Sequence, residues 1–117
     1  MPFAAPELEV TPEQLAAWVA EDPAAIQVVD VREPYERQAG YMEASRHIEL
    51  ERLASQADTL DRERPVVFYC RLGARSAMAA QAFQAAGYQA HTMVGGLMRW
   101  AQEGRPLVPD GGHVADH

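Results

Sequence analysis

The 117-residue sequence contains no lysine and only one cysteine, Cys70. A single cysteine excludes a disulfide within the chain, a two-thiol metal site and a CxxC redox pair. All ten cationic side chains are arginines, whose planar guanidinium groups bind oxyanions through paired N–H donors. Histidines do not replace the missing thiols, because His113 and His117 lie in a polar stretch after two glycines. We therefore expect neither a metal ion nor another cofactor.

Positive charge is scarce overall, since the formal net charge is −7. This balance argues against nucleic acid or an acidic membrane as a partner, because both attract clustered cations. The charge is uneven: residues 1–69 carry six Arg against fourteen Asp and Glu, and residues 70–117 carry four Arg against three. An anionic substrate should prefer the second half.

We expect neither a signal peptide nor a membrane span. Its N-terminus has no basic start and no apolar run of about 7 to 15 residues. Residues 76–98 contain no charged Asp, Glu, Lys or Arg, but three glutamines, His91 and several glycines make them too polar for a bilayer. A buried helix and strand with closely packed alanines is the better interpretation. The expected location is the cytoplasm, with Cys70 as a reduced thiol.

Strand-like and helix-like segments alternate along the chain. Thr11, Pro12 and Gln14 form a predicted capping box at the start of a helix that Asp22-Pro23 ends. Further helices are expected over 33–39, 50–60, 76–86 and 97–102, and strands over 8–10, 26–31, 46–49, 65–69 and 90–94. This order predicts an α/β domain over 1–107, with a mainly parallel central sheet, helices on both faces and ligands beyond the carboxyl ends of the strands. Residues 108–117 are predicted to be a flexible tail.

The most informative segment is 66–76, which reads as a strand, Cys70, a tight turn and a helix start. A lone cytosolic cysteine is more often a small buried hydrophobe, and this interpretation stays open. Alternatively, the six residues from Cys70 to Arg75 can curl so that successive N–H groups point at the sulfur as an anion nest. Gly73 can supply a positive φ or a close backbone approach there. Such a loop favours thiolate over thiol.

Two arginines and a serine complete this loop. A helix N-terminus contributes only about 0.3 to 2 kcal/mol to an anion, so nest N–H groups or a guanidinium must add to it. Arg75 is predicted to brace the loop. Bracing would itself be its functional role, so for Arg75 the structural and the functional hypotheses are the same. Arg71 either binds an anionic donor or is merely solvated. Ser76 is predicted to cap the following helix.

Three ordered segments, which together span about residues 8–106, resemble the rhodanese family. They are the loop Cys70-Arg71-Leu72-Gly73-Ala74-Arg75-Ser76, the early motif Asp30-Val31-Arg32 with Glu36 and Gly40, and the pair Gly95-Gly96 followed by Trp100. The resemblance implies a rhodanese-like fold. It also implies that Cys70 is the catalytic nucleophile and that the substrate-binding positions are Arg71, Leu72, Gly73, Ala74, Arg75 and Ser76.

The early motif implies supporting roles beneath the pocket. By resemblance, Asp30 and Arg32 are ionic or structural supports, with Glu36 pairing to Arg32. A solvated carboxylate at a strand end is the alternative for Asp30. Trp100 is interpreted as a core anchor, because aromatic side chains deliver large buried areas.

One stretch departs from the family pattern. An aromatic residue usually follows the position of Glu36, where this sequence has Arg37, and residues 40–45 replace a segment like Gly-His-Ile-Pro-Gly-Ala. The geometry of this loop, and of any surface it forms near the pocket, is therefore not predicted by the resemblance.

The implied activity is that of a thiosulfate sulfurtransferase. A small anionic donor such as thiosulfate would leave its outer sulfur on Cys70 as a persulfide, and cyanide or a thiol would remove it. The chain has no second cysteine to release the sulfur, so the acceptor must be external, either a small molecule or another protein. Two rivals remain: a persulfide relay or binding module, and a phosphatase or arsenate reductase. The active-site loops of phosphatases and arsenate reductases resemble Cys-x5-Arg, with five residues between the cysteine and the arginine. Only four residues separate Cys70 from Arg75.

Overall fold

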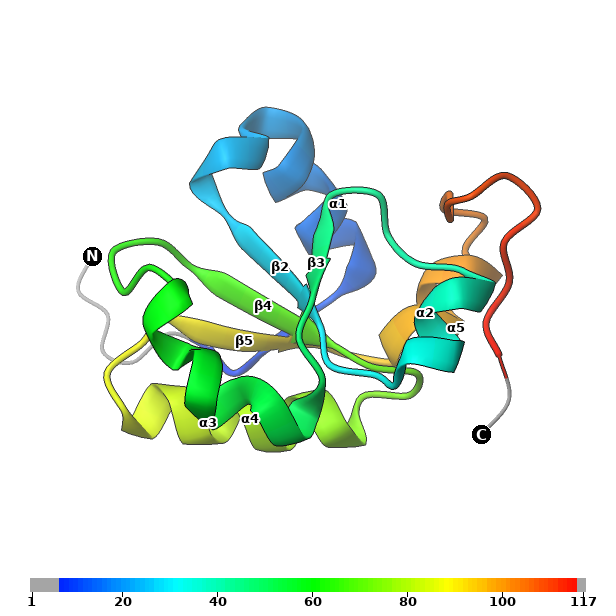
Figure 1. Ribbon diagram of the computed structural model, residues 1–117. Helices are drawn as coiled ribbons and strands as arrows, with labels where there is room; N and C mark the ends of the chain where they lie inside the picture. Colours follow the sequence, from blue (N-terminus) through cyan, green and yellow to red (C-terminus); the bar gives the residue numbers. More distant parts are fainter. Residues whose placement is uncertain (1–6, 116–117) are drawn as a thin grey trace.

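The computed structural model describes residues 7–115. One five-stranded sheet runs through it, with every neighbouring pair of strands parallel and the order β1-β5-β4-β2-β3 (Figure 1). The strands are β1 (Glu9–Val10), β2 (Gln27–Asp30), β3 (Ser45–His47), β4 (Val66–Tyr69) and β5 (Ala90–Met93). The helices are α1 (Pro12–Glu21), α2 (Pro34–Ala39), α3 (Leu53–Gln56), α4 (Ala74–Ala85) and α5 (Gly96–Gln102). The predicted α/β fold is confirmed.

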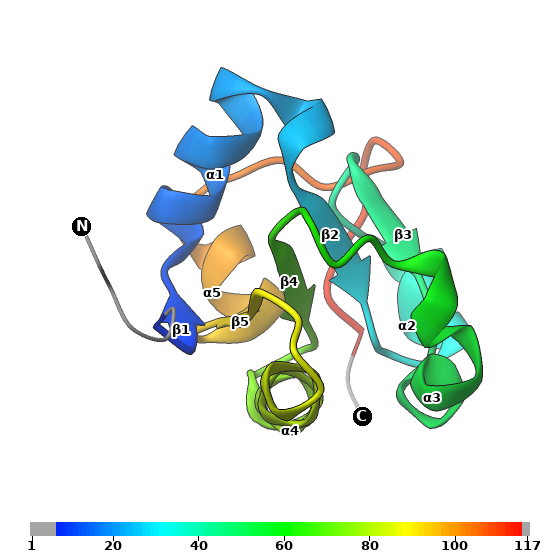
Figure 2. The ribbon, with the colours of Figure 1, turned by 90° about the vertical axis from the view of Figure 1, so that its left-hand side faces the viewer.

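Helices cover both faces of the sheet, which separates two apolar clusters of the core (Figure 2). Side chains alternate between the faces of a strand, so β4 contributes to both clusters. Phe68 and Cys70 pack in the cluster on the side of α3 and α4, together with Phe83. Tyr69 packs in the other cluster with Leu15 of α1. This alternation brings Cys70 to the face on which α4 begins.

The local sequence signals for the first two helices are confirmed. Thr11 and Gln14 form the predicted capping box at the start of α1. Gly40 is the C-cap of α2, and its N–H donates to the carbonyl of Glu36. Because α2 follows β2 directly, it lies at the carboxyl end of the sheet, on the same side as the end of β4 (Figure 1).

The predicted helix over 50–60 is not continuous. It breaks into the 3₁₀ turn Leu50–Arg52, the short α3 and the 3₁₀ turn Ala57–Thr59. The hydroxyls of Ser55 and Thr59 each donate to a carbonyl three residues earlier. Such bonds compete with the regular helical pattern, which explains the break.

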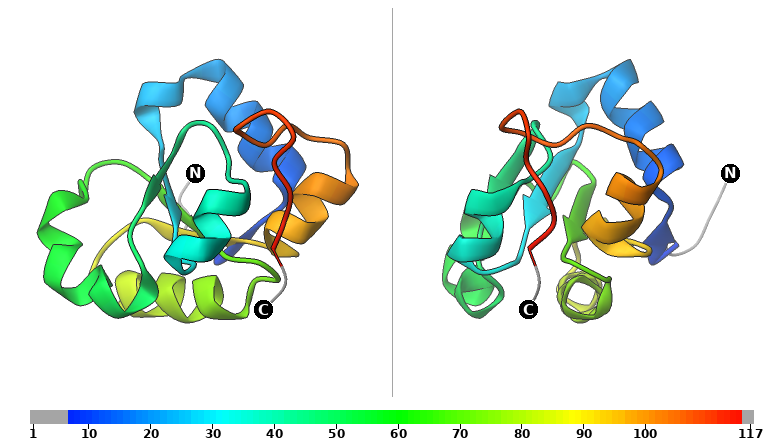
Figure 3. Two further views of the ribbon diagram at one scale, coloured as in Figure 1. Left: turned by 45° about the vertical axis from the view of Figure 1, so that its right-hand side comes forward. Right: turned by 90° about the vertical axis from the view of Figure 1, so that its right-hand side faces the viewer.

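Residues 107–115, which we call the C-terminal strap, follow α5 without further helix and cross the carboxyl end of the sheet between α2 and α5 (Figure 3). The predicted tail 108–117 falls on this strap, except for residues 116–117, which lie outside the described residues. The strap packs against the domain. The expectation that these residues are flexible stays a prediction. Within residues 7–115 no helix is long and apolar enough to cross a membrane.

Candidate functional site

Cys70 lies directly after β4, at the predicted carboxyl edge of the sheet, and its residue is 1% exposed. The start of α5 holds the adjoining backbone: Leu97 donates its N–H to the Cys70 carbonyl at 2.8 Å, and Met98 donates to the Arg71 carbonyl at 3.0 Å. Gly96 has a φ of +62°, and a Cβ there would overlap the Arg71 carbonyl. The Gly-Gly signature therefore serves the cysteine loop by close backbone approach.

Two polar groups contact the Cys70 sulfur. The Gly73 N–H donates to Sγ at 3.1 Å, and the Ser76 hydroxyl lies 3.5 Å from Sγ. Gly73 has a φ of +113°, the left-handed region that glycine adopts without strain, so the predicted need for glycine is confirmed. A hydrogen-bond donor at this distance stabilises a negative charge on sulfur more than a neutral thiol.

The prediction that Ser76 caps α4 is wrong. Gly73 is the N-cap, and Ser76 is the third residue of the helix. Its hydroxyl contacts the Thr92 hydroxyl at 2.6 Å, donates to the Gly73 carbonyl at 3.2 Å and faces the Cys70 sulfur. Ser76 is fully buried, so it links β5 to the sulfur rather than capping the helix.

Arg75 closes the loop by pairing with α2. Its two terminal nitrogens donate to the two carboxylate oxygens of Glu36 at 2.8 and 3.0 Å. Hydrogen bonding to Glu36 raises the pKa of Arg75 above its ordinary value. Glu36 is fully buried, and the side chain of Arg75 is 22% exposed, so the guanidinium borders solvent beside the loop. The predicted pairing of Glu36 with Arg32 is therefore wrong.

Arg32 pairs with Asp30 instead, and both side chains are fully buried. Arg32 Nε and Nη2 each donate to an Asp30 oxygen at 2.8 Å, and Nη2 also donates to the Gly40 carbonyl at 2.7 Å. Burial opposes the charge on Arg32, but the bonds to Asp30 and the charge of Asp30 hold its pKa above the ordinary value. The alternative of a solvated Asp30 is wrong, since this carboxylate is fully buried and binds Arg32, which in turn binds the Gly40 carbonyl at the end of α2.

The remaining predicted positions form the rim. Leu72 is 58% exposed, Ala74 is also exposed, and Arg71 donates its Nε–H to the Ala115 carbonyl of the strap at 3.2 Å. The alternative that Arg71 is merely solvated is therefore wrong. Binding of a donor by Arg71, Leu72 and Ala74 stays a prediction. Within residues 7–115 no three His, Cys, Asp or Glu side chains gather as metal ligands.

The segment that departs from the family pattern has its own set of contacts. Arg37 stacks on the Tyr41 ring, 3.7 Å from its centroid, and donates to the Ser45 carbonyl at 2.7 Å and to its hydroxyl at 2.9 Å. The Ser45 hydroxyl also contacts the Tyr69 hydroxyl at 2.9 Å, and burial raises the pKa of Tyr69. Arg37 therefore replaces an aromatic side chain by bracing the loop that follows α2.

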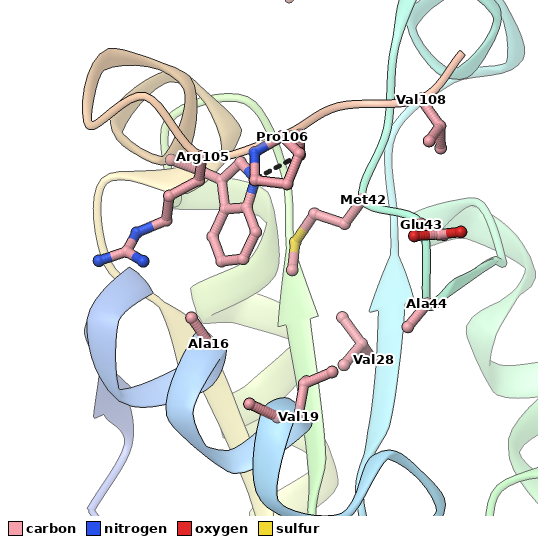
Figure 4. A pocket seen from close by; sticks show the side chains of 11 residues that line it. Ala16, Val19, Val28, Met42, Glu43, Ala44, Arg105, Pro106 and Val108 are labelled. Carbon is pink, nitrogen blue, oxygen red and sulfur yellow. Dashed lines mark hydrogen bonds between the residues drawn. The ribbon is translucent and has the colours of Figure 1, made fainter. Parts of the chain in front are cut away.

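An apolar pocket of about 280 Å³ lies elsewhere, between α1, β2 and the start of the strap (Figure 4). Val19, Val28, Met42 and Val108 contribute to its wall. Trp100 also lines it and donates its indole N–H to the Pro106 carbonyl at 2.8 Å, so Trp100 is a core anchor as predicted. No residue of the cysteine loop lines this pocket, so we assign the chemistry to the loop.

Comparison with known proteins agrees with this geometry. The family profile described as Rhodanese-like domain matches residues 11–103. A sulfurtransferase from Allochromatium vinosum is 31% identical over 105 residues, which cover 88% of this chain and 97% of that protein. The putative sulfurtransferase YtwF of Bacillus subtilis is 32% identical over 79 residues, 68% of this chain and 77% of that one.

A solved structure shows the same architecture. The crystal structure of a rhodanese-related protein from Thermoplasma volcanium superposes with a TM-score of 0.76 at 29% identity, over 87% of this chain and 98% of that one. The chain belongs to the rhodanese-like domain family, and the two relatives described above are named sulfurtransferases.

Proposed function

We propose that the protein is a thiosulfate sulfurtransferase that carries sulfane sulfur as a persulfide on Cys70. The observation that carries this proposal is the Gly73 N–H aimed at Cys70 Sγ in a loop that the Arg75–Glu36 pair closes. A donor fixed on the sulfur stabilises both the attacking thiolate and the persulfide anion.

The reaction proceeds by two displacements. The Cys70 thiolate attacks the outer sulfur of thiosulfate, the sulfur–sulfur bond of the donor breaks, and sulfite leaves with the electron pair. Cyanide or a thiolate then attacks the outer sulfur of the persulfide, which releases thiocyanate or a new persulfide and restores the Cys70 thiolate. No proton transfer is needed once the thiolate exists, so the site can work without a histidine partner.

The rim around Cys70 fits a small anionic donor. Arg71 and Arg75 both border the loop, and their guanidinium groups complement the charge of thiosulfate. The acceptor comes from outside the chain, as a small thiol, cyanide or the cysteine of another protein, because Cys70 is the only cysteine. We place the reaction in the cytoplasm, where a reducing environment keeps this thiol available.

The geometry disfavours a phosphatase. Such an enzyme needs its loop arginine to bind a tetrahedral oxyanion, whereas both terminal nitrogens of Arg75 bind Glu36. The loop is also one residue shorter than the phosphatase pattern. A noncatalytic binding module is disfavoured by the Gly73 contact to the sulfur, which such a module does not require.

Steady-state thiocyanate formation from thiosulfate and cyanide tests the proposal. We expect turnover by the wild type and none by Cys70→Ser, whereas Ser55→Ala, on the exposed surface, retains the wild-type rate. Polysulfide and a small persulfide serve as alternative donors. The proposal fails if no donor supports turnover, or if robust cleavage of an aryl phosphate depends on Cys70.

A further inference from the structure

The C-terminal strap is built into the domain rather than laid over it. Tyr41 and Val108 exchange both backbone hydrogen bonds, with distances of 3.0 and 2.9 Å. The N–H of His113 donates to the Ala39 carbonyl at 2.9 Å, at the end of α2. Leu107 and Val114 pack against the apolar cluster on the side of α1 and α5. The strap is thus fixed near both of its ends.

Two glycines let the strap approach α2 closely. A Cβ at Gly40 would lie 2.6 Å from the His113 carbonyl oxygen. A Cβ at Gly112 would lie 3.2 Å from the Ala39 oxygen and from the Gly40 Cα, and 2.8 Å from the Pro109 oxygen within the strap. Gly40 has a φ of 169°, extended backbone that any residue adopts. Glycine is therefore required at Gly40 by the contact with the strap and not by its own conformation.

The strap ends beside the catalytic loop. The Ala115 carbonyl accepts the Nε–H of Arg71, the residue that directly follows Cys70. The right-hand view of Figure 3 shows the strap crossing the carboxyl end of the sheet, where β4 ends. Cys70 itself is only 1% exposed, so any reagent must enter past its neighbours. The strap also lies beyond residues 11–103, the span that the family profile matches.

We propose that the C-terminal strap is an access filter over Cys70 that admits small donors and acceptors and excludes the cysteine of a folded protein. This inference rests on the proposed function, and it narrows the acceptors named there to a small thiol or cyanide. Its mechanism is a local opening equilibrium: the closed strap lets small anions pass, and only the displaced strap makes room for a bulky thiol.

Alkylation of Cys70 tests the filter without any sulfur transfer, and the single cysteine makes the labelled site unambiguous. Iodoacetamide serves as the small probe and a fluorescein maleimide as the bulky one. Two variants, Gly40→Ala and Gly112→Ala, crowd the contact between the strap and the end of α2 from opposite sides, and Gly112→Ala also crowds the Pro109 carbonyl within the strap. We expect each to raise the rate with the bulky probe by about tenfold and the rate with iodoacetamide by less than about threefold, because a shifted opening equilibrium favours the larger reagent.

Gly104→Ala is the matched control. It adds the same methyl group at a glycine with a φ of +78° and no atom within 4 Å of the added Cβ, so it strains the backbone without touching the strap. Its alkylation rates should stay near the wild-type values. If Gly40→Ala does not fold, Gly112→Ala still decides the question. The proposal is overturned if the folded strap variants alkylate like Gly104→Ala with both probes.

Persulfide discharge then tests the acceptor class. In the wild type, cyanide should discharge the Cys70 persulfide and a folded protein thiol such as reduced thioredoxin should discharge it at least about tenfold more slowly, with the gap narrowing in Gly112→Ala. Equal rates for both acceptors in the wild type would contradict the filter. Absence of any persulfide would contradict the proposed function alone, since the alkylation result stands without it.

Discussion

Two arginine–carboxylate pairs lie near the carboxyl end of the same sheet and have different surroundings. Asp30 and Arg32 are two residues apart and both fully buried. Glu36 and Arg75 are 39 residues apart, and Arg75 remains 22% exposed. The first pair fastens one turn of the backbone to the end of α2, whereas the second ties the cysteine loop to α2. The same chemistry therefore supports the fold in one place and the site in the other.

Burial decides what each pair can do. Charges that are fully buried depend on their partners to offset the cost of desolvation, so removing one member of such a pair is strongly destabilising. A pair at the rim keeps a guanidinium edge near solvent, where it can respond to an anion on the cysteine. Changes to the first pair should alter stability most, and changes to the second should alter reaction rates most.

The largest expected effect is on stability, from Arg32→Met. This substitution removes the bonds from Arg32 to Asp30 and leaves the buried carboxylate with Arg37 alone, whose Nη1 lies 3.4 Å from Oδ2. We expect the free energy of unfolding to fall by about 3 to 5 kcal/mol in urea titrations. Arg52→Met is the control, since Arg52 is 65% exposed and its pair with Glu49 measures 3.6 Å, and it should cost less than about 0.5 kcal/mol. Equal stability of the two variants would refute the structural role of Arg32.

The next effect is on rate, from Arg75→Lys. Lysine keeps a positive charge near Glu36 but cannot make the paired bonds that hold the loop. We expect the rate of persulfide formation to fall by about ten- to a hundredfold, while the free energy of unfolding falls by less than about 2 kcal/mol. Arg99→Lys, in an exposed pair with Glu103, should change neither quantity. An unchanged rate in Arg75→Lys would refute the role of the paired Arg75–Glu36 bonds in holding the loop for catalysis.

These pairs show where the sequence was sufficient and where it was not. Strand alternation and turn residues predicted the sheet, the strand end at Cys70 and the glycine at Gly73, because those features follow from local backbone chemistry. The partner of Glu36 was predicted wrongly, since offsets along a motif give positions and not contacts between α2 and α4. The role of Ser76 was missed for a similar reason, because Thr92 reaches it from β5.

The strap shows a second limit. It contains a proline and two adjacent glycines, which are typical of a tail, and its hydrogen bonds to Tyr41 and Ala39 are made by backbone groups that no side-chain pattern reveals. The available signals were Gly40 and Gly112, whose need for close approach becomes visible only when the two segments are placed together. The unusual Arg37 was recognised, but its contact with Tyr41 required the structure.

A smaller effect on rate is expected from Ser76→Ala. The substitution removes the hydroxyl that lies 3.5 Å from the Cys70 sulfur and leaves the Arg75–Glu36 pair intact. Because one modest hydrogen bond is lost, we expect the rate of persulfide formation to fall about fivefold. Rapid-quench mass analysis measures this rate. A loss as large as that of Arg75→Lys would show that the loop depends on Ser76 more than on the ion pair.

The smallest effect concerns the pH dependence of stability, which we assign to His91 and not to either arginine–carboxylate pair. Burial lowers the pKa of His91, which also contacts the Glu7 carbonyl, whereas the pKa values of Arg32 and Arg75 are raised and neither titrates near neutrality. Below the ordinary histidine value of 6.5 the unfolded chain binds more protons than the folded one, so stability falls as pH falls through that region. In the wild type, the urea concentration at the midpoint of unfolding should fall as the pH falls through this region. In His91→Gln this pH dependence should be lost. Persistence of the slope would assign it to another group.

The most direct test of the central claim is the intact mass of the protein after incubation with thiosulfate. The account predicts an added mass of one sulfur atom on the wild type, its loss on addition of cyanide, and no addition to Cys70→Ser. Absence of the adduct with thiosulfate, polysulfide and a small persulfide alike, on folded wild-type protein, would contradict it.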